Sequence, residues 1–382
     1  MKIGIVCYPT YGGSGIVATE IGMGLAAKNH EIHFISYKRP TRLISFHKNI
    51  YHHEVTPVEY PLFEYTPYES ALASKIVDVV KYSKLDLLHV HYAIPHAIVA
   101  YLAKNILRSE GINIPIITTL HGSDITLVGK DKTFSPVVTF SINESDGVTA
   151  VSKKLQEQTY ENFNITKPIE VIYNFIDFNR FHWTDKGHFR KMFAPEGEKI
   201  LVHISNFRKV KRASDVVRIF KGVTDVMPAK LLMIGDGPER PNIERECREL
   251  GLCDQIRFLG KQDAISEILA ISDVFLLPSA NESFGLAALE AMACKVPVVS
   301  SNVGGIPEVN IHGETGFLSD VGDIKAMTKN TLQLLQNPEL HQQFRENAYN
   351  QAKKFDLEFI LPQYEDYYQK ILHKSTVMAR DA

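Results

Sequence analysis

The feature that most constrains the fold is a series of short apolar runs that occurs twice, each run followed by a helix-length segment. The first series is Ile3–Cys7, Ile32–Ser36, Leu85–Val90, Ile114–Leu120 and Gly147–Val151. Apolar strands joined by helix-length crossovers pair in parallel and are covered on both faces. A second series follows at Ile200–Ile204, Lys230–Ile234, Ile256–Leu259, Val274–Leu277 and Val296–Ser300. The sequence therefore predicts an α/β protein with two doubly wound parallel-sheet domains.

The chain length agrees with two domains. Its 382 residues exceed the roughly 100–200 residues of a typical single domain. We expect a first domain over 1–172 and a second over 173–355, with the linker at Ile172–Asp185. The tail, 356–382, carries Tyr and Phe at helical spacing, and we expect its helix to return to the first domain. Ligands of open parallel sheets bind at the carboxyl ends of the strands, so the predicted site is a cleft between the domains.

Charge and composition exclude several classes of function. Lys plus Arg number 42 and Asp plus Glu number 44, so no basic excess indicates a nucleic-acid partner or stable binding to an anionic membrane. Met1–Val6 enters a strand pattern directly, without a leader pattern, and no apolar run reaches the roughly 20 residues that span a bilayer. The four cysteines form no CxxC pair. We expect a cytoplasmic protein, with a homo-oligomer left open.

A glycine-rich turn follows the first strand, at Tyr11-Gly12-Gly13-Ser14-Gly15. Glycines allow a close backbone approach, and the start of the following helix favours an anion. Gly13-x-Gly15-x-x-Ala18 also matches a dinucleotide fingerprint, but Ile35–Arg39 offers no carboxylate for the ribose. We therefore expect an anionic or sugar ligand near Ser14 and Gly15, with a simple tight turn as the alternative.

Histidines mark two later strand ends of the first domain. His121 follows Ile114–Leu120, where it could hydrogen-bond a sugar hydroxyl, carry a proton, or merely tie the loop to the domain. His89 and His91 lie two apart on a strand and face the same way, as half of a metal site would require. No Cys or carboxylate completes that site nearby. Polar contacts at the strand end are favoured over a metal, with Tyr92 among the candidates.

The second domain opens with a cationic loop, Asn206-Phe207-Arg208-Lys209-Val210-Lys211-Arg212. Arg binds phosphate in bidentate fashion and Lys acts as a point charge, so phosphate binding is favoured over a solvated turn. Glu290 is the one charge in the apolar helical run Leu286–Cys294, and a ribose diol would satisfy it. Glu282 precedes it by eight residues, about 12 Å of helical rise, more than the roughly 5–9.5 Å between glycosidase carboxyls. The pair fits the two ends of a long ligand such as a nucleotide sugar.

These residues together resemble a known family. Glu282-x7-Glu290 with Ser283-Phe284-Gly285-Leu286 is similar to the E-x7-E signature of the retaining glycosyltransferases of family GT4. Their GT-B fold has two facing Rossmann-like domains and a C-terminal helix that returns to the first. Gly12–Gly15, His121-Gly122, Arg208…Lys211, Gly235–Pro238 and Gly304–Glu308 follow in the order of that family. The resemblance spans nearly the whole chain.

The resemblance implies roles for individual residues. Arg208 and Lys211 would neutralise the donor diphosphate, Glu282 would bind the donor sugar, and His121 would contact a sugar hydroxyl near the reacting carbon. The expected donor-binding residues are Gly15, Asn206, Phe284, Gly285, Leu286 and Glu290, and the expected acceptor-binding residues are Ser14, Tyr92 and Thr119. Many relatives place the first cation directly after a glycine, whereas here Asn206 occupies that position and Arg208 comes two residues later. No metal or other cofactor is expected.

A closer resemblance, at His89–Ala97, Ser205–Arg212 and Gly260–Asp263, is to family members that act on UDP-N-acetylglucosamine and L-malate in bacillithiol biosynthesis. It implies transfer of N-acetylglucosamine from its UDP donor to the malate hydroxyl, with retention at the anomeric carbon. One alternative is another GT4 glycosyltransferase with a different small acceptor, and another is an enzyme like UDP-N-acetylglucosamine 2-epimerase. A two-domain binding protein without catalysis is disfavoured, because such proteins usually carry an export signal.

Overall fold

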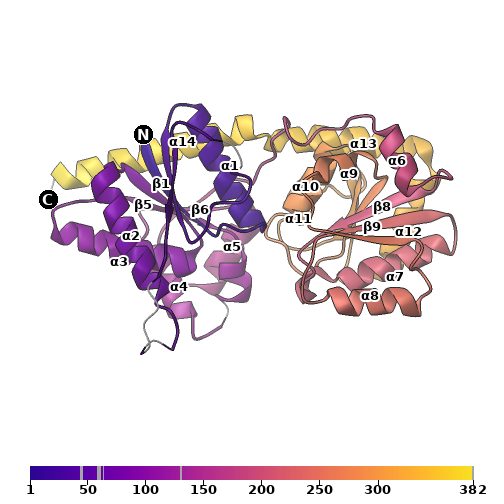
Figure 1. Cartoon of the computed structure of the whole chain (residues 1–382), viewed down its shortest axis with the longest axis horizontal. Helices are drawn as coiled ribbons and strands as arrows, with labels where there is room; N and C mark the ends of the chain where they lie inside the picture. Colours follow the sequence, from indigo (N-terminus) through magenta and orange to yellow (C-terminus); the bar gives the residue numbers. More distant parts are fainter. Residues whose placement is uncertain (44–45, 58–61, 63, 130, 381–382) are drawn as a thin grey trace. The chain divides into compact units, whose positions relative to one another are not determined.

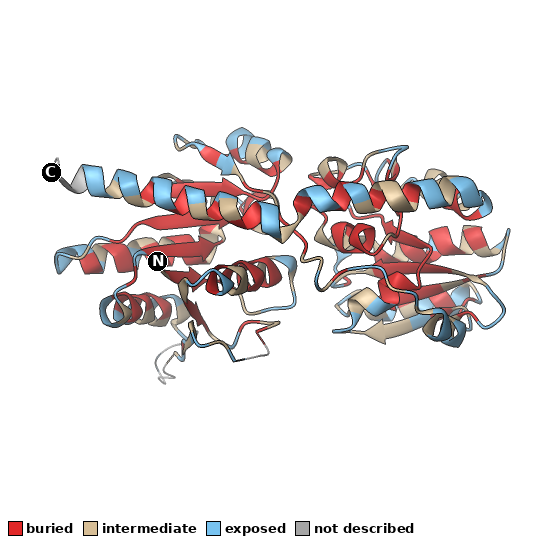
Figure 2. Cartoon of the chain, turned by 90° about the horizontal axis from the view of Figure 1, so that it is seen from above, coloured by how far each residue is buried: buried red, intermediate tan, exposed pale blue. Residues whose placement is uncertain are grey.

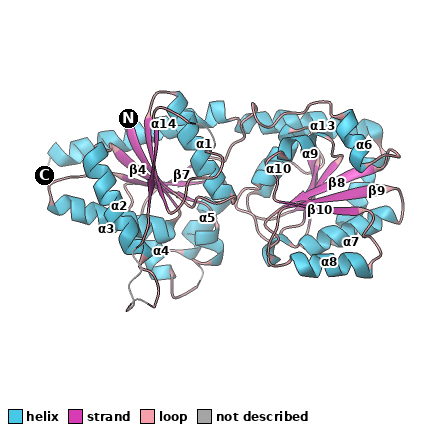
Figure 3. Cartoon of the chain, viewed as in Figure 1, coloured by secondary structure: helices cyan, strands magenta, loops and turns pink. Residues whose placement is uncertain are grey.

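The computed structural model describes residues 1–43, 46–57, 62, 64–129 and 131–380, of which 378–380 are described by their backbone alone. The chain divides into two compact units (Figure 1). The N-terminal unit comprises Met1–Asn174 and Glu358–Ala382, and the C-terminal unit comprises Phe175–Leu357. Within each unit, helices surround a central sheet (Figure 3).

The N-terminal unit is built on a seven-stranded sheet with the order β3-β2-β1-β4-β5-β6-β7. All of its strand pairs are parallel. The order reverses direction between β1 and β4, which is the switch point where open α/β sheets bind ligands. The strands are β1 (Lys2–Val6), β2 (Glu31–Ser36), β3 (Ile50–Glu54), β4 (Leu87–His91), β5 (Ile116–Leu120), β6 (Gly147–Ala150) and β7 (Ile169–Val171).

Helices cover both faces of this sheet. On one face, alternate β4 residues such as Leu88 and Val90 pack with apolar residues of α2 (Tyr68–Ser83) and α3 (Ile98–Ser109). On the other face, Gly22 of α1 (Gly13–Ala27) lies against Phe34, and any Cβ on Gly22 would collide with that ring. The remaining helices are α4 (Ser135–Glu144) and α5 (Lys153–Asn162). The period of two along β4 places His89 and His91 on the face opposite to α2 and α3.

The C-terminal helix α14 (Leu357–Arg380) packs on the N-terminal unit, as predicted. Tyr368 OH hydrogen-bonds to His89 Nδ1 at 2.7 Å, and the Tyr367 hydroxyl accepts from Val148 N at 2.9 Å. Glu365 pairs with Lys28 and with His30 after α1. Tyr364 and Tyr368 are fully buried. The tyrosines of the aromatic spacing therefore lie on the face of α14 that contacts the sheet, whereas Phe359 is exposed on its other face (Figure 2).

The C-terminal unit contains a six-stranded parallel sheet, ordered β10-β9-β8-β11-β12-β13, with its switch point between β8 and β11. Its strands are β8 (Lys199–Ile204), β9 (Ala229–Ile234), β10 (Ile256–Gly260), β11 (Val274–Leu277), β12 (Val298–Ser301) and β13 (Gly316–Ser319). Its helices are α6 (Gly187–Phe193), α7 (Ala213–Thr224), α8 (Arg240–Glu249), α9 (Ile265–Ala270), α10 (Leu286–Ala293), α11 (Ile306–Val309), α12 (Ile324–Gln336) and α13 (Pro338–Ala352).

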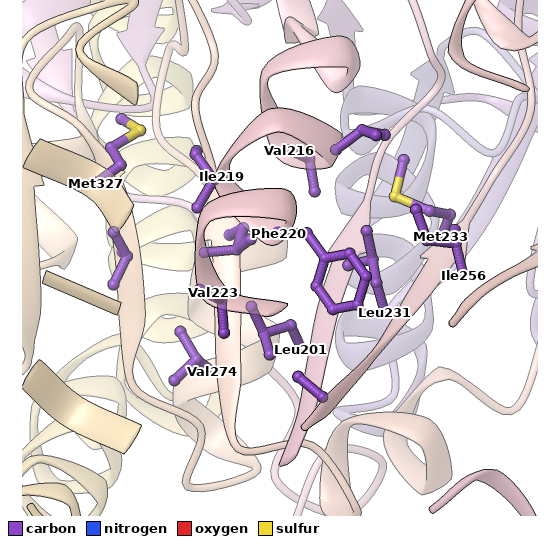
Figure 4. Close-up of a cluster of buried hydrophobic side chains, with 14 of the residues drawn as sticks. Leu201, Val216, Ile219, Phe220, Val223, Leu231, Met233, Ile256, Val274 and Met327 are labelled. Atoms are coloured by element: carbon purple, nitrogen blue, oxygen red, sulfur yellow. The ribbon is translucent and has the colours of Figure 1, made fainter. Parts of the chain in front are cut away.

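One core of this unit lies between its sheet and α7, α8 and α12 (Figure 4). Phe220 of α7 is fully buried there, with Leu201 from β8 and Leu231 from β9. Fully burying side chains of this size contributes about 1.5–3 kcal/mol each. This packing holds β8 and β9, and with them the loops at their carboxyl ends.

Three strands were not predicted: β3, β7 and β13. Strand β3 reads Ile-Tyr-His-His-Glu and lies at the sheet edge, half-exposed. Edge strands need no apolar face on both sides, so the apolar run that reveals a central strand is missing. Strand β7 spans three residues and β13 four, and both also lie at sheet edges. Among the described residues, no helix is both long enough and apolar enough to cross a bilayer.

Candidate active site

The predicted site residues of the N-terminal unit lie at the carboxyl ends of β1, β4 and β5 or in the segments that follow them, beside the switch point. Gly12 precedes α1 in extended conformation, and its carbonyl accepts from Gly15 N at 3.0 Å. A Cβ on Gly15 would lie 2.5 Å from the carbonyl oxygens of Tyr8 and Thr10. Only glycine fits where the loop folds back on the start of the helix. The glycine at this position is thus explained by a close backbone approach.

Tyr92 connects the loop after β4 to this glycine turn. Its hydroxyl donates to Ser14 Oγ at 2.8 Å, and its backbone N–H donates to the carbonyl of Thr119 at 2.9 Å. Tyr92 has a φ of 86°, a region that non-glycine residues rarely adopt. Such strain concentrates at functional sites. Two of the three predicted acceptor-binding residues, Ser14 and Tyr92, are therefore in direct contact.

Thr119 is less suited to acceptor binding than Ser14 and Tyr92. It is fully buried in β5, and its hydroxyl bonds to His89 Nε2 and to Thr149 Oγ1, both at 2.7 Å. These bonds use its donor and one acceptor position inside the domain. The side chain thus stabilises the sheet, and only the Thr119 backbone bond reaches the Tyr92 loop.

His121 lies directly after β5 and is nearly buried. Its Nε2 is 2.8 Å from Nδ1 of His91, and the two rings stack at 5.0 Å. Burial, together with His89 and His96 nearby, lowers the pKa of His121 to about 3. His121 is therefore neutral near pH 7, when it can donate a hydrogen bond but is a weak base.

Asp124 fixes the loop that carries His121, and the sequence analysis did not single it out. One carboxylate oxygen accepts from Ala93 N at 2.9 Å, and the other accepts from Gly122 N at 2.9 Å and His121 N at 3.3 Å. Burial raises the pKa of Asp124 to about 6, although these N–H groups act in the opposite direction. A carboxylate four residues after the end of a predicted strand was the sequence signal for this role.

In the C-terminal unit, the cationic loop follows β8. Glycines hold it against the loop after β9: a Cβ on Gly235 would overlap the Ser205 carbonyl, and one on Gly237 the Asn206 carbonyl. Phe207 is fully buried with a φ of 36°. The side chain of Arg208 is exposed, and Lys211 is partly buried. The burial of Phe207 therefore anchors a loop whose charges remain accessible.

Lys211 and Glu282, far apart in the sequence, form an ion pair. Lys211 Nζ lies 2.6 Å from Glu282 Oε1, which also accepts from Ser279 Oγ at 2.9 Å. The backbones are joined as well, since Ala280 N donates to the Val210 carbonyl at 2.8 Å. The structure thus brings together two of the residues predicted as catalytic. Ser279 was not predicted, and its short spacing from Glu282 was the only sequence signal.

Helix α10 begins at Leu286, after Gly285 with a φ of 95°. Phe284 is buried edge-on against Phe355 at 5.5 Å. The first N–H groups of α10 have no acceptor within the helix, as the predicted donor contact requires. Glu290 is nearly buried within α10, in agreement with its place in an apolar run.

The rise calculated between Glu282 and Glu290 rests on a wrong premise. It assumed helix throughout, whereas Glu282 lies outside α10, whose bounds are Leu286–Ala293. The about 12 Å derived from 1.5 Å per residue therefore does not apply. The case against a paired acid and base depends instead on the partners of Glu282, which is already paired with Lys211.

His89 and His91, considered as half of a metal site, instead form hydrogen bonds to other side chains. His89 is bonded to Tyr368 and Thr119, and His91 to His121. Across the described part of the chain, no group of three or more His, Cys, Asp or Glu side chains is arranged to hold a metal ion.

The family follows from comparison with known proteins. Residues 11–180 match the model of "Glycosyltransferase Family 4", and residues 185–351 match that of "Glycosyl transferases group 1". The chain belongs to this family and is a GT4 glycosyltransferase with the GT-B fold, as predicted. It is 50% identical over 374 residues to the N-acetyl-alpha-D-glucosaminyl L-malate synthase of Bacillus anthracis, covering 97% of each chain.

More distant proteins share the architecture. The 2-deoxystreptamine N-acetyl-D-glucosaminyltransferase of Niallia circulans is 25% identical over 75% of this chain and 77% of its own. The Anabaena protein HepE, solved with UDP-glucose, superposes with a TM-score of 0.84 at 22% identity, over 97% of this chain and all of its own. Sucrose-phosphate synthase of Thermosynechococcus elongatus gives a TM-score of 0.83 at 19% identity, over 98% of this chain and 100% of its own. At these identities, the solved structures establish the fold alone.

Proposed function

We propose that this chain transfers N-acetylglucosamine from UDP-N-acetylglucosamine to the hydroxyl of L-malate, the first step of bacillithiol biosynthesis. The observation that carries the proposal is the 50% identity, over 97% of both chains, to a protein named for that product. The donor and acceptor are both small molecules, and no metal takes part. Each of the two units supplies groups that suit one of these substrates.

The C-terminal unit would bind the donor. Arg208 and Lys211 would contact the diphosphate, because Arg and Lys both bind phosphate and lie at the end of β8. The backbone N–H groups of Gly285 and Leu286 would add donors at the start of α10. Glu290 would accept from the ribose hydroxyls, and Glu282 from a hydroxyl of the sugar. Asn206 would lie beside the diphosphate, where many relatives have a glycine.

The N-terminal unit would bind the acceptor. Ser14 and Tyr92 offer hydroxyls that are already hydrogen-bonded to each other. Gly15, predicted for donor binding, is buried at the start of α1, so it would act only by letting the loop fold closely onto the start of the helix. His121 would donate to a hydroxyl of the donor sugar. Thr119 would contribute to acceptor binding only indirectly, because its carbonyl accepts from Tyr92 N and holds the loop that carries Tyr92.

The chemistry requires one bond exchange at the anomeric carbon. The bond from this carbon to the UDP oxygen breaks, a bond to the malate oxygen forms on the same face, and the malate proton passes to the leaving phosphate oxygen. Arg208 and Lys211 would stabilise the negative charge that develops on the diphosphate. His121 is a poor base because burial lowers its pKa to about 3, which supports proton transfer to the donor itself.

A coupled assay for UDP release tests the proposal. With UDP-N-acetylglucosamine as donor, we expect release only when L-malate is present, and expect it to persist in a metal chelator. Product analysis should show the α-anomer. Release with glucose or inositol phosphate but none with malate would contradict the proposed acceptor. A Lys211→Ala variant should lose at least about tenfold in kcat, the effect of one charge-assisted contact.

A further inference from the structure

The buried histidine pair of the N-terminal unit fixes where the proton of His121 lies. His91 and His121 share one hydrogen bond between Nδ1 of His91 and Nε2 of His121, 2.8 Å apart. Each neutral imidazole carries one N–H, so one of these nitrogens donates and the other accepts. The two possible arrangements give His121 opposite hydrogen-bonding properties on its other nitrogen. The surroundings of His91 distinguish them.

The second ring nitrogen of His91, Nε2, distinguishes the two arrangements. His91 Nε2 is buried and has no hydrogen-bond partner within the described residues. If His121 donated to His91, the His91 proton would have to lie on Nε2 as a buried donor without an acceptor. If His91 donates from Nδ1, its Nε2 is only an acceptor without a donor. Buried N–H groups without an acceptor are rarer in folded proteins than buried acceptors without a donor, so the second arrangement is favoured.

A neighbouring histidine shows the same pattern without ambiguity. His96 Nδ1 lies 2.5 Å from the carbonyl oxygen of His91, and a carbonyl can only accept. The proton of His96 therefore lies on Nδ1, and its Nε2 is a buried atom without a partner in the described chain. Burial lowers the pKa of His91 well below its usual range and that of His96 to about 4, so both rings are neutral.

We infer that His91 is a positioning residue that donates from Nδ1 to His121 and thereby places the proton of His121 on Nδ1. The Nδ1 atom of His121 has no hydrogen-bond partner among the described residues, and the residue retains 7% of its surface exposed. His121 thus offers its ligand a fixed N–H donor. It binds an oxygen with a free lone pair and does not take the proton of the acceptor.

The inference rests on the proposed function only for the identity of the ligand, which would be a hydroxyl of the donor sugar. It gives the two histidines at the end of β4 a hydrogen-bonding role in place of metal binding. His89 is held separately, by Tyr368 and Thr119. The two histidines therefore differ in role, although both face the same side of β4.

Nitrogen-15 NMR of the full chain, labelled at histidine, tests the assignment without substrate. Two-bond proton–nitrogen spectra distinguish protonated from unprotonated ring nitrogens, and the His121→Asn variant identifies the His121 signals. We expect a protonated Nδ1 and an unprotonated, hydrogen-bonded Nε2 in His121. This pattern should persist from about pH 6 to 8, because the pKa of His121 is about 3. A proton on Nε2 would overturn the inference.

Two variants of His91 separate donation from packing. His91→Asn retains an N–H donor near the position of Nδ1, so the His121 spectrum should be unchanged and kcat/KM should stay within about threefold. His91→Leu fills the space without a donor, so His121 Nε2 should lose its hydrogen-bonded shift and kcat/KM should fall about tenfold. Identical His121 spectra in His91→Leu and the parent protein would contradict the inference. Exposed His373 gives the control: His373→Asn should alter neither readout.

Failure of this inference can be distinguished from failure of the proposed function. If malate-dependent UDP release is found but the His121 proton lies on Nε2, the role of His91 is wrong and the function stands. If the spectrum is as expected but malate gives no UDP release, the donor N–H stands and serves a different ligand.

Discussion

Gly304 is the position where a single methyl group should separate fold from activity. Its φ is 55°, and a Cβ there would overlap the carbonyl oxygen of Glu282. That carbonyl also accepts from Gly305 N at 3.0 Å. Gly313 offers a matched control in the same unit, because its φ is 77° but a Cβ there meets nothing within 4 Å. Gly304→Ala and Gly313→Ala therefore both force alanine into a left-handed conformation, but only the Cβ of Gly304→Ala collides with a carbonyl oxygen, that of Glu282.

The expected losses of stability follow from the left-handed conformation and from the collision with the Glu282 carbonyl. A left-handed conformation costs a non-glycine residue about 1–2 kcal/mol, which is the full expected loss for Gly313→Ala. Gly304→Ala adds the displacement of Glu282 and a weakened hydrogen bond of about 1 kcal/mol, so we expect about 2–4 kcal/mol in total. Clearing the overlap moves the Glu282 backbone by about 1 Å, and such misplacement costs about 100-fold in rate.

Urea unfolding and malate-dependent UDP release measure the two effects. We expect Gly313→Ala to retain activity within about threefold, with its strain expressed only in stability. Gly304→Ala should remain folded at low temperature but lose about 100-fold in kcat. If folded Gly304→Ala were as active as Gly313→Ala, the contact between Gly304 and Glu282 would not position the site.

Three further predictions concern single side chains. Glu290→Ala should weaken UDP binding by calorimetry about 10–100-fold, the loss of hydrogen bonds to a charged group, while circular dichroism stays unchanged; equal UDP affinity would remove the ribose role. Burial raises the pKa of Asp124 to about 6, so this carboxyl binds more protons in the folded than in the unfolded chain, and its contribution to the free energy of unfolding falls as the pH rises from about 4 to 6. In urea unfolding at several pH values, Asp124→Asn should abolish this fall. A contribution from Asp124 that rises over this pH range would refute the raised pKa. Tyr368→Phe should lower the free energy of unfolding by about 1–2 kcal/mol, because it removes the hydrogen bond to buried His89. Tyr82→Phe, at an exposed site, should leave it almost unchanged, and equal losses in the two variants would contradict a stabilising role of that hydrogen bond.

The central strands were readable from the sequence because burial on both faces leaves a continuous apolar run. The C-terminal helix was readable because its buried tyrosines recur at helical spacing. Strand β3 was not, since Ile50–Glu54 gains its place by pairing with β2 at the sheet edge. The same distinction applies to the site. Glycine-rich turns, strand-end histidines and the cationic loop are local patterns, and in the structure they lie at the carboxyl ends of β1, β4, β5 and β8 or in the segments that follow them.

The amino-acid order by itself determined the two doubly wound domains, the family and the segments proposed to carry the chemistry, because periodicity and turn-forming residues act over short distances along the chain. Only the tertiary structure decided which of those groups touch. The pairing of Lys211 with Glu282 spans 71 positions, and that of His91 with His121 spans 30. Such contacts arise when parallel strands bring their carboxyl ends to one edge of a sheet, and no local pattern records the partner of a side chain across that edge.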